Sequence, residues 1–98
     1  MPPLDAERLR ALLPEVKGWR VENDRRELHK RFELGTFAAA IAFVNRMAEL
    51  AEAEGHHPDF CVRYDVLDVT LTTHAVHGLS ENDFILAAKL DELVARGP

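Results

Sequence analysis

A chain of 98 residues holds one hydrophobic core, because a chain of this length buries roughly 60–70% of its unfolded surface. Its formal net charge of −5 argues against a general binder of nucleic acids or anionic membranes, since such proteins need clustered lysine and arginine. The single cysteine, Cys61, excludes a disulfide within the chain and a metal site made of several cysteines. We interpret it as a small core or interface residue.

The sequence contains no recognisable targeting or membrane segment. Its first residues are charged and lack the apolar core of a signal peptide. The longest apolar stretch, residues 37–44, is far too short to span a bilayer. Because low-complexity segments and linkers are missing as well, we expect one cytoplasmic domain over residues 1–98.

The first third of the sequence predicts a helix followed by a hairpin. Residues 5–13 predict the helix, with an aspartate as its N-cap and a proline directly after it. Residues 19–22 alternate with period two, and residues 23–24 are turn formers. A strand over residues 27–33 pairs naturally with the first one.

The middle of the sequence predicts a longer helix and a second hairpin. Thr36 is a typical N-cap residue, and apolar residues recur at helical spacing over residues 37–53. Gly55 stands where a glycine commonly ends a helix. Residues 60–64 and 69–73 alternate in the manner of strands, and residues 65–67 are expected to form the turn between them.

The last segment begins with a capping box. Ser80 and Asp83 have the spacing at which two side chains cap a helix reciprocally. Apolar residues then predict a helix over residues 84–94, ended by Gly97 and Pro98. The order is therefore α-β-β-α-β-β-α, which indicates an α+β fold with a four-stranded antiparallel sheet and helices on one face.

Histidines are the residues that point most clearly to chemistry. His56 and His57 follow the central helix, and Pro58 restricts the backbone there, so the two rings should point in different directions. His74 stands at the end of the last predicted strand, which a hairpin brings back toward that pair. Histidine gives and takes protons near neutral pH, so three imidazoles around one pocket indicate acid–base catalysis.

These candidate residues have alternative interpretations. Three histidines can hold zinc, but adjacent residues rarely aim both rings at one ion, so we favour a site without metal. Asp83 is interpreted first as a helix cap and second as a catalytic group. Glu52, on the last turn of the central helix, either orients a histidine or is solvated surface. The remaining candidates are interpreted as surface or packing residues: His29, His77, Tyr64 and Trp19.

The spacing of these residues resembles the signature of the pterin-4a-carbinolamine dehydratase family. In that signature an acidic residue precedes a His-His-Pro triplet, and an aromatic residue, a histidine and an aspartate follow. Each element is present at the expected spacing, in Glu52, His56-His57-Pro58, Tyr64, His74 and Asp83. The similarity covers residues 4–94, which is nearly the whole chain.

The resemblance implies an enzyme. The family dehydrates 4a-hydroxytetrahydropterins, such as 4a-hydroxytetrahydrobiopterin, to the quinonoid dihydropterin. This step belongs to tetrahydrobiopterin biosynthesis and recycling, and it serves the aromatic amino-acid hydroxylases. No metal or cofactor is needed, and members form homodimers or homotetramers. An exposed sheet edge gives an independent reason to expect subunit pairing.

The resemblance also implies roles for individual residues. His56 and His74 would handle the protons and His57 would help to position the pterin, although the sequence does not separate these roles. Glu52 and Asp83 would support them. The residues expected to bind the pterin are Gly55, His56, His57, Pro58, Thr72, Thr73, His74 and Ala75. Ala75 stands where many members have an acidic or polar residue.

A second class of function stays open within the same family. Some relatives are interaction proteins, acting as dimerisation cofactors of a transcription factor or as assembly factors of a carbon-fixing enzyme. The assembly relatives tend to lose part of the histidine set. The complete set in this chain therefore favours the enzyme.

Overall fold

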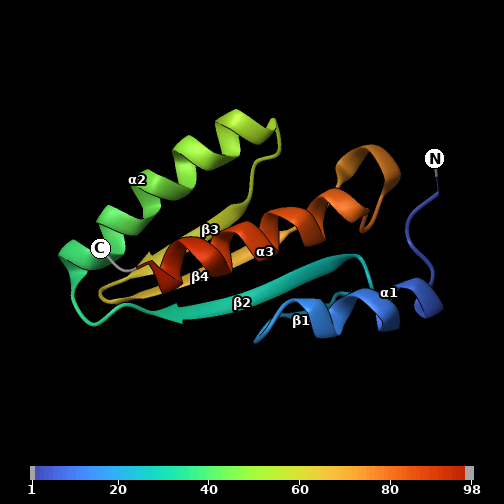
Figure 1. Ribbon diagram of the computed structural model, residues 1–98, viewed down its shortest axis with the longest axis horizontal. Helices are drawn as coiled ribbons and strands as arrows, with labels where there is room; N and C mark the ends of the chain where they lie inside the picture. The colour runs from blue at the N-terminus through green and yellow to red at the C-terminus, as the bar shows by residue number, and fades with distance from the viewer. Residues whose placement is uncertain (1, 97–98) are drawn as a thin grey trace.

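The computed structural model describes residues 2–96, which form three α-helices, two short 3₁₀ turns and four strands (Figure 1). In chain order the elements are α1 (Ala6–Leu12), η1 (Leu13–Glu15), β1 (Arg20–Glu22), β2 (Glu27–Glu33), α2 (Phe37–Glu54), β3 (Asp59–Arg63), β4 (Val66–Leu71), η2 (His74–Val76) and α3 (Glu81–Ala95). The predicted order and the α+β class are confirmed. Within the described residues, none of the helices has the length and apolar character needed to cross a membrane.

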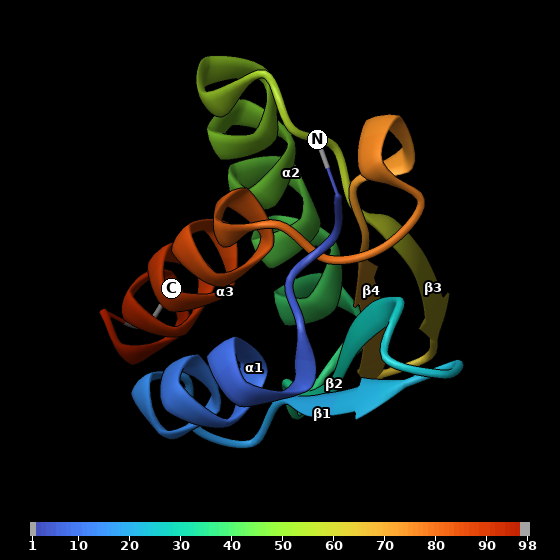
Figure 2. The ribbon, with the colours of Figure 1, turned by 90° about the vertical axis from the view of Figure 1, so that its right-hand side faces the viewer.

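The four strands form one antiparallel sheet in the order β1-β2-β4-β3. The two hairpins therefore meet through their second strands, and the register places Leu28 opposite Leu71 and Phe32 opposite Leu67. The helices lie on one face of the sheet, and the opposite face is left uncovered (Figure 2). The edges of the sheet are β1 and β3.

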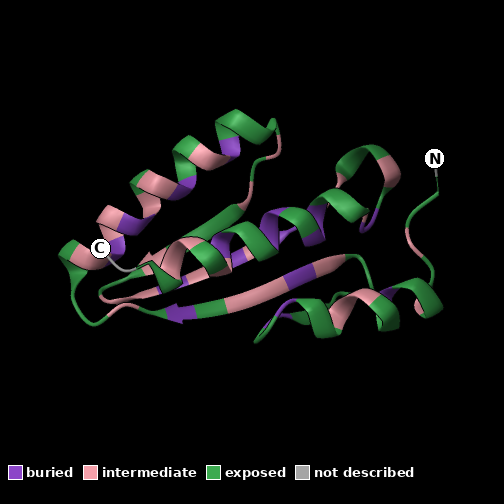
Figure 3. Ribbon diagram, viewed as in Figure 1, coloured by how far each residue is buried: buried purple, intermediate pink, exposed green. Residues whose placement is uncertain are grey.

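The hydrophobic core lies between the sheet and the helices (Figure 3). Leu28, Leu67 and Leu71 are fully buried because they occupy inward positions of β2 and β4, most of which are apolar. The helices contribute Phe43 and Met47 from α2. Burial of a side chain of this size stabilises the fold by roughly 1.5–3 kcal/mol relative to exposure.

Trp19 fastens the first hairpin to α3. Its indole Nε1 donates to Asp91 Oδ1 at 3.0 Å, and Lys30 Nζ donates to the same oxygen at 2.7 Å. Trp19 also packs edge-on against Phe32 and is only 4% exposed, so its interpretation as a packing residue is confirmed. The half-buried Lys30 is tolerated on the inner face because Asp91 compensates its charge.

Local capping signals in the sequence were good guides to the starts of the helices. Asp5 accepts a hydrogen bond from the Arg8 backbone at 2.8 Å, and Thr36 accepts one from Ala39 at 3.0 Å. The first helix ends one residue earlier than expected, since Leu13 already belongs to the 3₁₀ turn that contains the proline. The predicted stop of the last helix, residues 97–98, lies outside the described residues.

The second hairpin differs from its predicted boundaries. β3 and β4 are joined by a turn at Tyr64 and Asp65, where residues 65–67 were expected to turn. Tyr64 has a φ of 55°, ends the strand and is 71% exposed, so its interpretation as a packing residue is wrong. The pairing of Arg63 with Val66 fixes this register, and it leaves Thr72 and Thr73 outside β4.

Cys61 lies on the edge strand β3 and is exposed. The expectation of a core position is therefore wrong, and a role at a subunit interface stays a prediction. The reason is topological: β3 is an edge strand with only one neighbour, and most of its residues are exposed.

The uncovered face of the sheet carries an ionic cluster centred on Asp68. Arg31 lies directly across from it on β2 and donates from Nε at 2.9 Å, and Arg63 on β3 donates at 2.5 Å. The hydrogen bond from Arg31 is the main cause that lowers the pKa of Asp68. His29, expected at the surface, is partly buried beside the same cluster, with Nε2 3.7 Å from Asp68. Such a face is stable in contact with water.

Candidate functional site

The end of α2 sets the positions of the two adjacent histidines. Gly55 follows the helix in the left-handed conformation, with φ 65° and ψ 29°, and its N–H bonds to carbonyls of the last turn. The backbone N–H of His56 then donates to the Ala51 carbonyl at 3.1 Å. Glycine adopts this conformation at no steric cost, so it reverses the chain where the helix stops.

His56 is held by the buried carboxylate of Asp83. Its Nε2 lies 2.5 Å from Asp83 Oδ1, and its side chain is only 16% exposed. Asp83 is completely buried, in the first turn of α3. The contact joins the loop after α2 to the start of α3.

Asp83 also caps its own helix, as expected. Its Oδ2 accepts from the Ser80 backbone N–H at 2.9 Å, and the Ser80 side chain accepts in return from the Asp83 backbone. The hydroxyl group of Thr73 donates to the same Oδ2 at 2.7 Å. The interpretation of Asp83 as a helix cap is therefore confirmed, and its interpretation as a catalytic group stays a prediction.

His57 has different surroundings. Its Nε2 contacts Glu52 Oε2, and both side chains are largely exposed. Glu52 therefore contacts a histidine and is exposed to solvent at the same time, so both of its interpretations fit the structure. The two adjacent histidines therefore have separate carboxylate partners, one buried and one at the surface, and their rings point in different directions as expected.

His74 begins η2, directly after Thr73. The backbone N–H of Thr73 donates to the Gly78 carbonyl at 2.8 Å, and the backbone N–H of Gly78 donates to the Thr73 carbonyl at 3.4 Å. These two hydrogen bonds close the loop that carries His74. His74 is exposed. It lines a hollow of about 210 Å³ together with Asn23, Arg26, Glu27, Thr72 and His77.

The structure therefore brings the predicted residues together only in part. Figures 1 and 2 place the loop after α2 and the η2 loop at the same end of the molecule. Thr73 links them, because it binds the carboxylate that His56 contacts and is followed by His74. Within residues 2–96 no hydrogen bond or ion pair joins the three histidines to one another. Their convergence on one bound molecule stays a prediction.

Thr72, Ala75 and Pro58, which were predicted to bind the pterin, each have their own surroundings. Thr72 donates its hydroxyl proton to the Arg26 carbonyl at 2.7 Å, so its side chain ties the η2 loop to the first hairpin. Ala75 is exposed in η2, and Pro58 is partly buried after the two histidines. Among the described residues, no group of three or more histidine, cysteine, aspartate or glutamate side chains is arranged to hold a metal ion.

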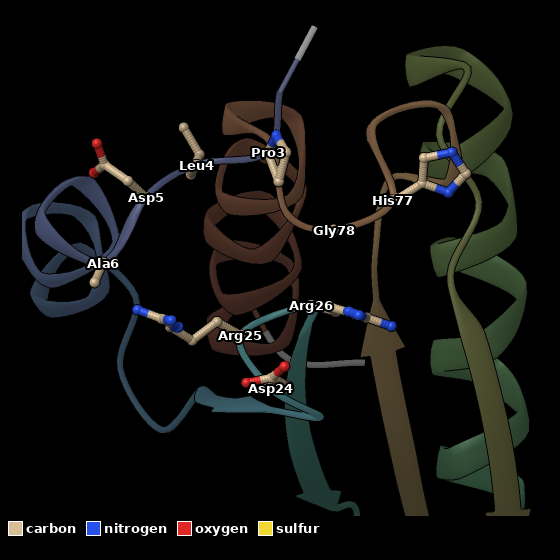
Figure 4. Close-up of a pocket in the computed structure, with 9 residues that line it drawn as sticks. All are labelled: Pro3, Leu4, Asp5, Ala6, Asp24, Arg25, Arg26, His77 and Gly78. Carbon is tan, nitrogen blue, oxygen red and sulfur yellow. The ribbon is translucent and has the colours of Figure 1, made fainter.

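A larger hollow of about 410 Å³ lies beside this region (Figure 4). It is bounded by the N-terminal segment, the tip of the first hairpin and the end of the η2 loop. The residues that line it are Pro3, Leu4, Asp5, Ala6, Asp24, Arg25, Arg26, His77 and Gly78. None of the three predicted catalytic histidines lines it. Gly78 is required there, because an added Cβ would lie 2.8 Å from Pro3 Cβ.

The sequence did not reveal that the capping aspartate and the first histidine are partners. A capping box is recognised from four consecutive residues, whereas the contact with His56 spans 27 positions. The sequence does contain a signal that Asp83 needs partners from other segments. Asp83 stands one position before a buried phenylalanine, and a carboxylate at such a helix start needs partners from other segments when it is buried.

Comparison with known proteins identifies relatives over nearly the whole chain. A sequence model of the pterin 4 alpha carbinolamine dehydratase family matches residues 2–93. Two bacterial relatives carry the name "Putative pterin-4-alpha-carbinolamine dehydratase". The one from Halorhodospira halophila is 45% identical, over 95% of this chain and 85% of its own length. The one from Chloroflexus aurantiacus is 46% identical, over 96% and 99%.

Two solved structures are similar in fold. A "transcriptional coactivator/pterin dehydratase" from Brucella melitensis superimposes with a TM-score of 0.88 at 30% identity, covering 93% of this chain and 97% of that protein. A pterin dehydratase-like protein described as a RuBisCO assembly factor of the α-carboxysome superimposes with a TM-score of 0.69 at 29% identity, covering 81% and 92%. These two similar structures are therefore described with different activities.

Proposed function

Because the chain belongs to the pterin-4a-carbinolamine dehydratase family, we propose that it removes water from a 4a-hydroxytetrahydropterin and forms the quinonoid dihydropterin. The C4a–oxygen bond breaks, and the hydroxyl group takes up a proton and leaves as water. Ring nitrogen N5 loses its proton, and the electron pair of that N–H bond forms the C4a–N5 double bond. One group must donate a proton and another must accept one, which is general acid–base catalysis.

The observation that carries this proposal is the buried pair of His56 and Asp83. A carboxylate in contact with an imidazole fixes the orientation of the ring and compensates the positive charge that forms when the ring takes up a proton. His74 follows Thr73, which binds the same carboxylate. We assign the two proton transfers to His56 and His74.

The remaining predicted residues would hold the flat pterin ring. His57, oriented by Glu52 at the surface, would position the ring from one side. The backbone at Gly55 and Pro58 and the segment 72–75 would supply hydrogen bonds to its polar edge. The hollow beside His74 supports this placement, because it leaves room next to the proposed proton-transfer group.

The exposed strand β3 supports assembly of the chain into a homodimer or homotetramer. An edge strand offers unpaired backbone groups and invites pairing with a second chain. On β3 and the turn after it, Phe60 is 49% exposed and Tyr64 is 71% exposed. Pairing of subunits would cover these side chains. The enzyme would then act in the cytoplasm as a symmetric oligomer that recycles the cofactor of an aromatic amino-acid hydroxylase.

A stopped-flow assay tests the proposed reaction. A hydroxylase generates the 4a-carbinolamine, and its conversion to quinonoid dihydropterin is followed with and without this protein. We expect conversion faster than the spontaneous rate, and in proportion to protein concentration. A rate equal to the spontaneous rate at micromolar protein would contradict the proposal.

The alternative function is that of a non-catalytic interaction protein, a transcriptional dimerisation cofactor or an enzyme-assembly factor. The descriptions of the two similar structures favour keeping this candidate. The complete set of His56, His57 and His74 favours the enzyme. The two functions differ in their dependence on these rings, because an interaction protein would keep its function after His56→Ala.

A further inference from the structure

We propose that Thr73 and Ser80 are positioning residues, whose hydroxyl groups determine through Asp83 which nitrogen of His56 meets the substrate. This inference rests on the proposed dehydratase function, and it deepens it by naming the reacting atom. A chain of hydrogen bonds carries this inference, from Ser80 through Thr73 and Asp83 to His56.

The first link is between the two hydroxyl groups. Thr73 Oγ1 lies 2.7 Å from Asp83 Oδ2, to which it donates, and 2.8 Å from Ser80 Oγ. A hydroxyl group has one proton, so Thr73 must accept from Ser80. Ser80 Oγ in turn accepts from the backbone N–H of Asp83. The chain therefore runs in one direction, from Ser80 to Thr73 to the carboxylate.

The second link is between the carboxylate and the ring. Asp83 Oδ2 accepts from the Thr73 hydroxyl and from the Ser80 backbone N–H at 2.9 Å, so Oδ1 is the oxygen left to contact the ring. An imidazole is a stronger base than a carboxylate, so the proton between Oδ1 and Nε2 of His56, which lie 2.5 Å apart, belongs to the ring and Oδ1 accepts it. The neutral ring is thereby held in the tautomer with its proton on Nε2.

The consequence concerns the other ring nitrogen. Nδ1 of His56 has no hydrogen-bond partner within residues 2–96. It is left as the atom that takes a proton from the substrate or returns one to it. The Asp83 carboxylate, completely buried, compensates the charge on the ring at that moment. Fixing the tautomer matters because a ring with its proton on Nδ1 could accept no proton there.

Thr73 supports both residues to which we assign the proton transfers. Its hydroxyl group supports the carboxylate that orients His56, and its backbone closes the loop that carries His74. A change that removes only the hydroxyl group therefore separates the proposed role from the structural one. Thr73→Val does this with little change in shape, and Thr73→Ser is the matched control because it keeps the hydroxyl group.

The test combines kinetics with nuclear magnetic resonance. For Thr73→Val we expect kcat to fall about tenfold, since a hydrogen bond to a charged group is lost, with KM changed less than about twofold. The pH at half-maximal kcat should rise, because a carboxylate with one donor fewer holds the ring proton more tightly. Thr73→Ser should restore both quantities to near the wild-type values. A purely structural role would lower the melting temperature and leave the pH midpoint in place.

A second variant and a second measurement cover the case in which Thr73→Val does not fold. Ser80→Gly removes the outer hydroxyl group, but glycine is a tolerated N-cap, so we expect a smaller shift in the same direction. Long-range ¹H–¹⁵N spectra of the wild-type protein should show the neutral His56 ring with its proton on Nε2. A proton on Nδ1, or unchanged kcat and pH midpoint in both variants, would overturn the proposal.

These measurements also separate this inference from the proposed function. If the wild-type protein does not accelerate dehydration, the proposed function fails. The ring tautomer and the titration midpoint of His56, measured by resonance in wild type and Thr73→Val, still decide whether the hydroxyl chain controls the ring.

Discussion

His56 Nε2 and Asp83 Oδ1 lie 2.5 Å apart although 27 positions separate them in the sequence. The contact fastens the loop after α2 to the first turn of α3. Because Asp83 also forms the capping box of α3, the helix start and the histidine depend on the same carboxylate. Loss of both carboxylate oxygens should therefore change stability and turnover together.

Removal of either proposed proton-transfer histidine should lower turnover. We expect His56→Ala and His74→Ala each to reduce kcat/KM at least about tenfold, the lower part of the range for a lost general acid or base. Steady-state assays with hydroxylase-generated carbinolamine measure this. His29→Ala is the control, because His29 lies in the ionic cluster on the uncovered face. Equal losses in all three variants would argue against specific roles.

Two substitutions at Asp83 should separate its two roles. Asp83→Asn keeps an oxygen that can accept from Ser80 and Thr73, so the helix cap is largely preserved, but its amide cannot accept from Nε2–H of His56. Asp83→Ala loses both functions. We expect at least about tenfold lower kcat for each variant. The free energy of unfolding should fall by about 1–3 kcal/mol for Asp83→Ala and by less for Asp83→Asn.

Urea denaturation and kinetic assays on the same samples measure both quantities. If Asp83→Asn turns over substrate at the wild-type rate, the carboxylate serves only the helix.

Chelation should leave the activity unchanged. The proposed chemistry consists of proton transfers by histidine, so exhaustive dialysis against a chelator should not alter kcat. The measurement is the dehydration rate before and after dialysis, followed by addition of zinc. Activity that disappears with the chelator and returns with zinc would replace the proton-transfer mechanism with a metal-dependent one.

The ionic cluster at Asp68 should make stability depend on pH in the acidic range. Arg31 lowers the pKa of Asp68 in the folded protein below its ordinary value, which is about 3.9 in an unfolded chain. The unfolded chain then binds more protons between these two values, so stability rises with pH across that window and is lost as pH falls through the folded pKa.

Unfolding experiments on Asp68→Asn check this. The stability difference between wild type and variant should be full above about pH 5 and should shrink as pH falls below about 4. Asp59→Asn on the neighbouring strand is a matched control. A difference that is independent of pH would show that Asp68 contributes through shape alone.

The protein should be a stable oligomer. Light scattering at micromolar concentrations should give a mass that is a small even multiple of the 11.1 kDa chain, since symmetric pairing is the commonest arrangement. Phe60→Lys, which places a charge on the edge strand, should shift the mass toward the single chain if β3 lies in an interface. A single-chain mass for the wild type would show that the edges are protected in another way.

The sequence was a good guide wherever a signal is local. Asp5, Thr36 and Ser80 identify helix starts because an N-cap is defined by residues three positions apart. The end of α2 was predicted equally well, since Gly55 has the left-handed conformation that glycine favours.

The boundaries of the second hairpin were harder to predict from the sequence, for a physical reason. Its turn places Tyr64 at positive φ, where glycine or asparagine is usual, so the residue gave a strand signal in place of a turn signal. β4 also pairs along its whole length with β2, so residues far apart in the sequence contribute to its position in the sheet. The contact of His56 with Asp83 is of the same kind, because only the packing of α3 against the end of α2 brings the two together.

The attachment of Trp19 to Asp91 gives the protein an internal optical probe. Trp19 is the single tryptophan of the chain, it is buried, and its indole N–H is bonded to a residue of α3. Its fluorescence emission therefore reports on whether α3 is docked on the first hairpin. The same helix carries Asp83 in its first turn, so detachment of the helix would release His56 and shift the emission to longer wavelength in one event.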